Sequence, residues 1–65
     1  MIKNRMKELR AKHGLKQEDL AARVGVRRET IGNLETGRYN PSLVLAWHIA
    51  EVFGVPIEEV FTVED

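Results

Sequence analysis

Few side chains in this sequence are arranged for catalysis. His13 and His48 have no further ligand-type residues around them at a metal-binding spacing. Glu58 and Glu59 are adjacent on an expected helix and therefore point apart, which suits a shared acid–base pair poorly. Ser42 has no nearby base that would make it a nucleophile. We therefore expect no enzymatic activity, no metal and no cofactor.

Basic side chains are the other candidates for chemistry, because they are gathered in one part of the chain. Ten Lys and Arg residues balance ten Asp and Glu residues, so the formal net charge is zero. Residues 1–40 hold all ten bases and five acids, a net charge of +5, whereas residues 41–65 hold five acids and no base, a net charge of −5. Such a dipole would orient the domain on a polyanion, although an unevenly charged surface without a partner gives the same pattern.

Residues 17–36, within the basic part, have the spacing of two short helices that cross steeply around a tight turn. Ala21 is small, as expected where the two backbones pass closest, and Gly25 follows the first helix, where glycine readily adopts a left-handed conformation. The apolar positions of this segment are Leu20, Val24, Val26, Ile31 and Leu34. The pattern is typical of DNA-binding helix-turn-helix units and indicates a sequence-specific DNA-binding regulator.

Hydrophobic periodicity divides the rest of the chain into further helices of one domain, residues 1–65. The expected helical segments are about 3–13, 17–24, 27–36, 42–53 and 56–61, each of the first four ending near a glycine. Ser42 or Asn40 would cap the fourth segment. Its expected core positions are Leu43, Ala46, Ile49, Ala50 and Phe53. No stretch resembles a strand, so the predicted fold class is all-α.

Composition indicates the cellular compartment in which the protein acts. The chain has no cysteine, which excludes disulfides and fits the reducing cytoplasm in which we expect the protein to act. Its longest apolar run, residues 43–47, is far too short to span a bilayer. The first residues alternate charged and apolar side chains and lack the apolar core of a secretory signal. No membrane association is expected.

Nearly the whole chain, about residues 3–61, resembles the Cro/lambda-repressor-like helix-turn-helix family, also called the XRE family. The similar stretches are MKELRAKHGLKQEDLAARVGV, RRETIGNLETG and RYNPSLVLAWHIAEVFGVPIEEVF. The resemblance implies a five-helix, lambda-repressor-like domain that binds double-stranded DNA and regulates transcription, most simply as a repressor.

The resemblance places the start of the third helical segment in the major groove of DNA. Arg28 is the first choice for a base contact, because its planar fork fits guanine O6 and N7. Glu29 could accept a hydrogen bond from cytosine N4, or could simply favour the positive end of its helix. Asn33 could pair with adenine or reach a phosphate. Gly32 lies on the same side, where a close approach to DNA, or mere tolerance of a weak helix former, would explain it.

The resemblance assigns phosphate contacts to residues on both sides of that segment. Gln17 matches a position that holds a phosphate at a helix N-terminus, and the alternative is that Gln17 only caps its helix. The other candidates are Arg27, Thr30, Arg38, Tyr39 and Asn40. Thr30 could instead pack against the helices. Many relatives carry serine or threonine where Arg27 stands and glutamine where Glu29 stands, so the target DNA sequence stays open.

Arg10 and Glu35 match a second, structural feature of the family. Relatives often join the first helix to the end of the recognition helix by a partly buried ion pair at these positions. Such a pair sets the orientation of two helices more than it adds stability, because desolvation offsets most of the attraction.

The C-terminal part has more apolar side chains than one small core needs, and we expect a homodimer built through it. The candidate surface residues are Val44, Trp47, Ile57, Val60 and Phe61. A two-fold dimer would set two recognition helices about one DNA turn apart. Alternatively, Trp47 and Phe61 cover the core of the monomer. A protein partner, as for an antitoxin or a co-activator, is a further alternative. RNA binding is less favoured, since the basic half has few aromatic residues.

Overall fold

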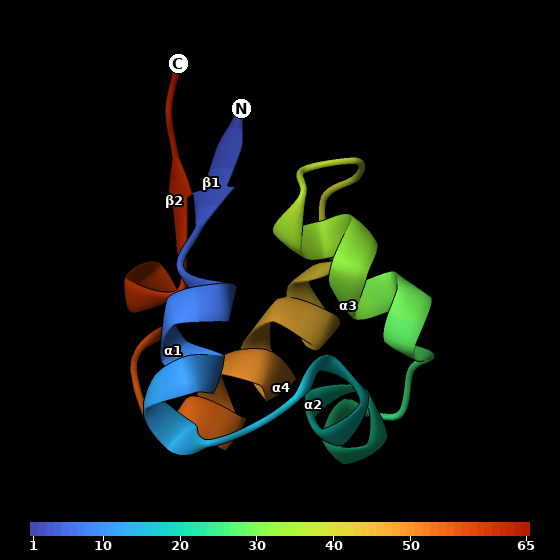
Figure 1. Cartoon of the computed structure of the whole chain (residues 1–65). Coiled ribbons are helices and arrows are strands. Elements are labelled where there is room, and N and C mark those ends of the chain that lie inside the picture. Colours follow the sequence, from blue (N-terminus) through green and yellow to red (C-terminus); the bar gives the residue numbers. More distant parts are fainter.

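The computed structural model describes all residues, 1–65, and contains four α-helices, one 3-10 helix and a two-stranded sheet (Figure 1). Along the chain the elements are β1 (Ile2–Asn4), α1 (Met6–His13), α2 (Gln17–Val24), α3 (Arg28–Glu35), α4 (Leu43–Phe53), η1 (Ile57–Glu59) and β2 (Phe61–Val63). The two termini lie side by side at one end of the molecule. None of the helices has the length and apolar character that a bilayer crossing requires.

The prediction of a five-helix, all-α domain is correct for the helical body and wrong at the two ends of the chain. Residues 57–59 form a single 3-10 turn after Pro56 instead of a fifth α-helix. Residues 2–4 and 61–63 pair as antiparallel strands, with Lys3 opposite Thr62, so α1 begins at Met6 and not near Lys3. Three-residue strands are too short for an alternating pattern to be recognisable in sequence.

The core is formed by side chains from all four α-helices, with Val60 closing it from the C-terminal side. Its members are Met6, Leu9, Leu20, Ala21, Ile31, Leu34, Ile49, Ala50, Phe53 and Val60. Ala21 is 3% exposed, as predicted for the crossing of two helices, whereas Leu43 is 75% exposed and the prediction that it is a core residue is wrong. Leu43 is the first residue of α4, in a turn that extends beyond the core, and Leu45 packs against the core instead.

Helix ends follow the expected capping chemistry. The Ser42 hydroxyl accepts a hydrogen bond from the Leu45 N–H at 3.1 Å, so Ser42 rather than Asn40 caps α4. Gly25 ends α2 with φ of 75°, and its N–H donates to the Ala21 carbonyl. A residue with a side chain would be strained there, so this glycine sets the turn into α3.

Asn4 connects the terminal sheet to two helices. Its Nδ2 donates to the Leu34 carbonyl at the end of α3 (3.1 Å), and its Oδ1 accepts from the Met6 N–H at the start of α1 (3.1 Å). The sheet that carries Asn4 is closed by hydrogen bonds between Met1 and Glu64 in both directions, at 2.9 and 2.8 Å. The paired termini therefore help to position α3.

At the start of α1, Arg5 and Glu8 form an exposed ion pair with Nη2 2.6 Å from Oε2. The hydrogen bond from Arg5 and its positive charge lower the pKa of the Glu8 carboxyl, and the same contact raises the pKa of Arg5. Because both side chains are solvated, the pair adds little to stability.

We predict that Asn4→Ala lowers the free energy of unfolding by about 2 kcal/mol, because it removes two partly buried hydrogen bonds worth about 1 kcal/mol each. Urea denaturation followed by tryptophan fluorescence measures the change. Lys3→Ala is the control in the same strand: it removes only an exposed ion pair to Glu64 and should change stability by less than about 0.5 kcal/mol. Equal midpoints for the two variants would contradict a positioning role for Asn4.

Candidate nucleic-acid interface

Helices α2 and α3 cross steeply and are joined by the short turn of residues 25–27 (Figure 1). The Val26 N–H donates to the Ala21 carbonyl at 3.0 Å, which holds the turn against the end of α2. Ile31 and Leu34 of α3 point into the core, at 0% and 2% exposure. The opposite side of α3 is consequently left free, as the helix-turn-helix pattern predicts.

The free side of α3 carries the residues expected to contact bases. Arg28 and Glu29 are exposed in its first turn, and Gly32 and Asn33 are half-buried one turn later. Arg27 precedes the helix as its N-cap and is exposed, with no side-chain hydrogen bond to the helix. The structure thus places four of the five on α3 and Arg27 directly before it, with the charged side chains of the five at the N-terminal end of the helix.

The expected phosphate-contacting residues lie at both ends of α3. Arg38, Tyr39 and Asn40 are exposed in the loop after the helix, and the Arg38 N–H donates to the Asn33 carbonyl at 2.9 Å. The Tyr39 hydroxyl donates to the Thr30 carbonyl at 3.4 Å, so the tyrosine folds back along α3. Thr30 is itself half-buried.

Gln17 is the first residue of α2 and does not cap that helix. The N-cap is Lys16, whose N–H donates to the Asp19 carboxylate at 2.8 Å. The amide side chain of Gln17 points instead toward α3, where its Oε1 accepts a hydrogen bond from Arg28 Nη1 at 3.2 Å. The alternative in which Gln17 only caps its helix is therefore wrong, because its side chain bonds α3 and Lys16 is the N-cap.

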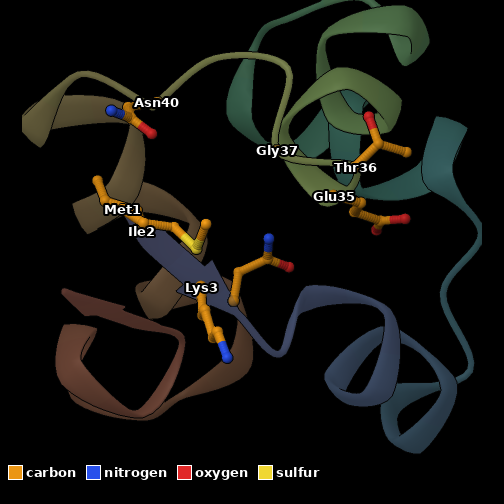
Figure 2. A pocket seen from close by; sticks show the side chains of 8 residues that line it. Met1, Ile2, Lys3, Glu35, Thr36, Gly37 and Asn40 are labelled. Carbon is orange, nitrogen blue, oxygen red and sulfur yellow. The ribbon is translucent and has the colours of Figure 1, made fainter. Parts of the chain in front are cut away.

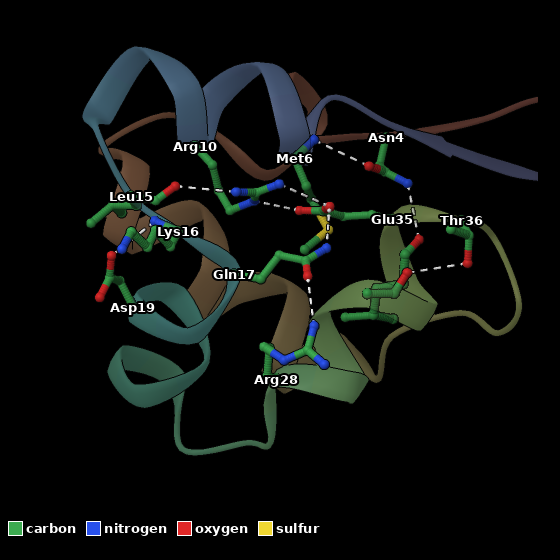
Figure 3. A network of polar contacts seen from close by, with 12 residues as sticks. Asn4, Met6, Arg10, Leu15, Lys16, Gln17, Asp19, Arg28, Glu35 and Thr36 are labelled. Atoms are coloured by element: carbon green, nitrogen blue, oxygen red, sulfur yellow. Dashed lines mark hydrogen bonds and ion pairs between the residues drawn. The ribbon is translucent and has the colours of Figure 1, made fainter.

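Arg10 and Glu35 form the expected ion pair between α1 and α3 (Figure 3). Arg10 donates from Nε to Glu35 Oε2 at 2.6 Å and from Nη2 to Oε1 at 3.1 Å. A third bond joins Arg10 Nη1 to the Leu15 carbonyl at 3.2 Å. The two side chains are only 13% and 8% exposed, so this fork-to-fork contact is largely removed from water.

The ion pair continues into a polar chain that sequence reasoning missed. Gln17 Nε2 donates to Glu35 Oε1 at 3.0 Å, so Arg10, Glu35, Gln17 and Arg28 are linked in series. The sequence singled out Arg10 and Glu35 as an ion pair, Gln17 as a phosphate contact and Arg28 as a base contact, but did not connect these roles. Only the packing of α1, α2 and α3 in three dimensions brings the four together.

No neighbouring backbone in the protein requires the glycine at position 32. A Cβ built there would lie 3.7 Å from Gln17 Nε2, which is an ordinary van der Waals contact. Packing within the domain therefore does not explain Gly32, and the two explanations given by the sequence, closeness to DNA or simple tolerance, both remain.

A polar cleft of about 470 Å³ lies between the terminal sheet and the end of α3 (Figure 2). Lys3 and Met1 line one side, and Thr36, Gly37 and Asn40 line the other. The structure contains no group of three His, Cys, Asp or Glu side chains that could hold a metal ion. The cleft adjoins the loop of residues 38–40 and extends the same polar face.

The predicted dimer residues divide into two groups. Val44 and Trp47 are 66% and 57% exposed on α4, and Ile57 is half-buried in a small groove of about 200 Å³ beside Trp47. Val60 is 1% exposed because it fills the monomer core, so its assignment to a dimer surface is wrong. The alternative prediction, that Trp47 and Phe61 cover the monomer core, is correct for Phe61, which packs against the core. It is wrong for Trp47, which is exposed.

Comparison with known proteins identifies what this chain is similar to. The family model described as Helix-turn-helix matches residues 6–60. An uncharacterized HTH-type transcriptional regulator of Archaeoglobus fulgidus is 56% identical over 64 residues, covering 98% of this chain and 91% of that protein. The cryptic phage CTXphi transcriptional repressor RstR of Vibrio cholerae is 33% identical over 60 residues, covering 92% of this chain and 54% of that protein.

Among solved structures, the restriction-modification controller protein C.AhdI from Aeromonas hydrophila superposes with a TM-score of 0.79 at 38% identity. The superposition covers 85% of this chain and 83% of C.AhdI. The resemblance first seen in the sequence is thus confirmed both by related sequences and by the shape of the domain.

We predict that Arg10→Met lowers the free energy of unfolding by about 3 kcal/mol or more, because it leaves the Glu35 carboxylate buried without its charged partner. Replacing both partners, as Arg10→Met with Glu35→Leu, should recover much of that loss. Thermal and urea melting of the two variants measure the difference. An unchanged midpoint for Arg10→Met, or a double variant weaker than the single one, would contradict this account.

Proposed function

The chain belongs to the Cro/lambda-repressor-like (XRE) helix-turn-helix family of transcriptional regulators, and on that basis we propose that it binds specific sites in double-stranded DNA with α3 in the major groove. One observation carries the proposal. The exposed first turn of α3, with Arg28 and Glu29, lies between Gln17 at the start of α2 and the exposed loop of residues 38–40. A base-reading edge flanked by phosphate-binding groups is the arrangement that a groove with two phosphate ridges requires.

Charge supports the same orientation. Arg27, Arg28 and Arg38 are exposed at the two ends of α3, and every Lys and Arg of the chain lies in residues 1–40. Residues 41–65, which hold five acids and no base, form α4, η1 and β2, and of these η1 and β2 lie on the other side of the molecule from α3 (Figure 1). The domain therefore approaches a polyanion with α3 leading, and its affinity should fall steeply as salt rises.

We assign base readout to the first two turns of α3. Arg28 addresses guanine O6 and N7, Glu29 accepts from cytosine N4, and Asn33 pairs with adenine. Gly32 stands between them without a side chain, and no contact inside the domain needs it to be a glycine. Close approach of the helix backbone to the DNA is the role that we assign to this position.

Phosphate contacts come from the flanks of α3. Arg27 and Arg38 supply charge, and the free N–H groups at the start of α2 beside Gln17 supply hydrogen-bond donors. Asn40 extends the same line of contacts. We assign Tyr39 and Thr30 a joint role, because the bond between them holds the loop against α3 at 3.4 Å.

Repression is the mode of regulation that we propose. Binding of a small domain to an operator blocks other proteins from the same DNA without any further activity. The similarity to RstR, which is named a transcriptional repressor, supports this mode.

We propose that the protein acts as a homodimer whose interface includes Val44, Trp47 and Ile57. Val44 and Trp47 of α4 are both more than half exposed, and Trp47 lines the groove that contains Ile57. Contiguous exposed apolar surface of this kind marks protein contacts. A two-fold axis through it would space two α3 helices for half-sites about 34 Å apart. A different protein that carries basic residues is the second candidate occupant, because Glu51 and Glu58 also line the groove.

We predict distinct effects for two arginines. Arg28→Ala should reduce discrimination at one base pair of the half-site by about tenfold, because one bidentate contact is worth about 1–3 kcal/mol. Arg38→Ala should weaken binding to all DNA sequences alike. It should also reduce the slope of log affinity against log salt concentration by the amount expected for about one phosphate contact. Selection from a random duplex library, followed by titration at several salt concentrations, measures both. If the wild type selects no sequence, DNA recognition by α3 is refuted.

We predict that Val44→Lys abolishes dimerisation, because it places a charge in the apolar interface, while the fold is kept, since Val44 is 66% exposed. Sedimentation at micromolar concentration, with and without duplex DNA, measures the species. Lys12→Ala, on the exposed side of α1, is the surface control. A wild type that stays monomeric on its selected DNA would end the dimer proposal and favour the basic protein partner.

A further inference from the structure

Strand β1 has one edge that no other strand covers. Met1 and Arg5 bond with their backbones to the C-terminal segment, Met1 at 2.9 and 2.8 Å and Arg5 at 2.9 Å. Every second residue of an antiparallel strand bonds to the same neighbour, so Lys3 belongs to this set. The backbone N–H and C=O groups of Ile2 and Asn4 consequently point away from β2.

The free edge of β1 borders the polar cleft of about 470 Å³ (Figure 2). Residues 1–4 all line this cleft, whereas no residue of β2 does. Thr36, Gly37 and Asn40 stand across from them at the end of α3. Strand β1 therefore lies between β2 and the cleft, as the order of the ribbons in Figure 1 also shows.

An uncovered strand edge offers hydrogen-bond donors and acceptors in alternation. An extended peptide satisfies both kinds of group at once, which is the mode of recognition called β-strand addition. The phosphates of DNA satisfy only the N–H groups, because phosphate oxygens accept hydrogen bonds and the carbonyls of the edge would remain unpaired. The backbone chemistry of the cleft thus favours a peptide over a nucleic acid.

We propose that the cleft accepts an extended acidic segment of a partner protein as a third strand beside β1. Ile2 and Val63 form a cross-strand pair on one face of the sheet, and Val63 is 72% exposed. An apolar residue beside Ile2 would cover this pair. Lys3 lies on the opposite face, since side chains alternate along a strand, and an acidic residue beside it forms an opposite-charge pair. The segment therefore alternates apolar and acidic residues.

A second copy of this chain suits the edge less well. Its own β1 would bring a second Lys3 to the first, and like charges opposite each other destabilise a strand pair. It would also bring a second cleft wall, since residues 36, 37 and 40 stand across the cleft from β1 in every copy. The inference does not depend on the proposed DNA binding, because the strand edge itself carries it.

Binding of a short blocked peptide to the full chain tests the proposal. Acetyl-Thr-Val-Glu-Val-Thr-amide has the alternating pattern, and the same peptide with lysine in place of glutamate is its matched control. We expect hydrogen exchange at the Ile2 and Asn4 amides, followed by NMR, to slow about tenfold when the glutamate peptide is present at about ten times its Kd. The Lys3 amide, which already points to β2, should change little.

A charge exchange distinguishes a specific site from general attraction. Lys3→Glu should bind the lysine peptide about tenfold more tightly than the glutamate peptide, which reverses the preference of the wild type. The substitution removes only an exposed contact to Glu64 (3.4 Å), so the domain should stay folded, and thermal melting establishes this. Lys3→Ala should bind both peptides alike.

N-methylated peptides test the backbone contacts. The amides of successive residues point to opposite edges of a strand, so of two peptides methylated at the glutamate or at both valines, only one should bind. Equal binding of these two peptides, a preference that Lys3→Glu does not reverse, or no protection of the Ile2 and Asn4 amides would overturn the proposal. Protection of the same amides by duplex DNA selected from a random library, without a response to the peptide, would also overturn it and would assign the cleft to the DNA interface.

Discussion

The ion pair between Arg10 and Glu35 is the contact on which the orientation of the exposed side of α3 depends. It spans from α1 to the last residue of α3, helices that share no other charged contact, and it is almost completely shielded from water. Its net stabilisation is small, because both ions lose their hydration. The pair instead fixes the angle between two helices. Both hydrogen bonds from Arg10 to Glu35 can form only when α1 and α3 have one relative orientation.

The helical body could be read from the sequence because its signals are local and repeated. Apolar spacing in residues 17–36 located α2 and α3 to within about one residue, and glycines marked the helix ends. Ser42 could be assigned as a helix N-cap, because serine is strongly preferred there. Ala21 could be assigned to the crossing of α2 and α3, because only a small side chain fits where two helices pass closely. The family resemblance, and not this spacing, placed Arg28, Glu29 and the loop of residues 38–40 on the surface, where the structure has them exposed.

What sequence reasoning missed depends on contacts between distant parts of the chain. Strands β1 and β2 are three residues each and are separated by nearly the whole chain, so neither has a recognisable pattern alone. Val60 was assigned to the surface because the strand after it was not foreseen, and that strand turns Val60 into the core. The bridging amide of Gln17 likewise has no signal in sequence, because its partners are 11 and 18 residues away.

The terminal sheet has a consequence for the order in which the domain is completed. Strand β1 is synthesised before every helix of the domain, yet its partner lies at residues 61–63. Helices α1 to α4 can collapse together before that point, but Asn4 reaches its place beside Leu34 only after the last strand has arrived. A nascent chain would therefore carry a helix-turn-helix in which Asn4 does not yet hold the C-terminal end of α3, and that contact forms only when β1 and β2 have paired.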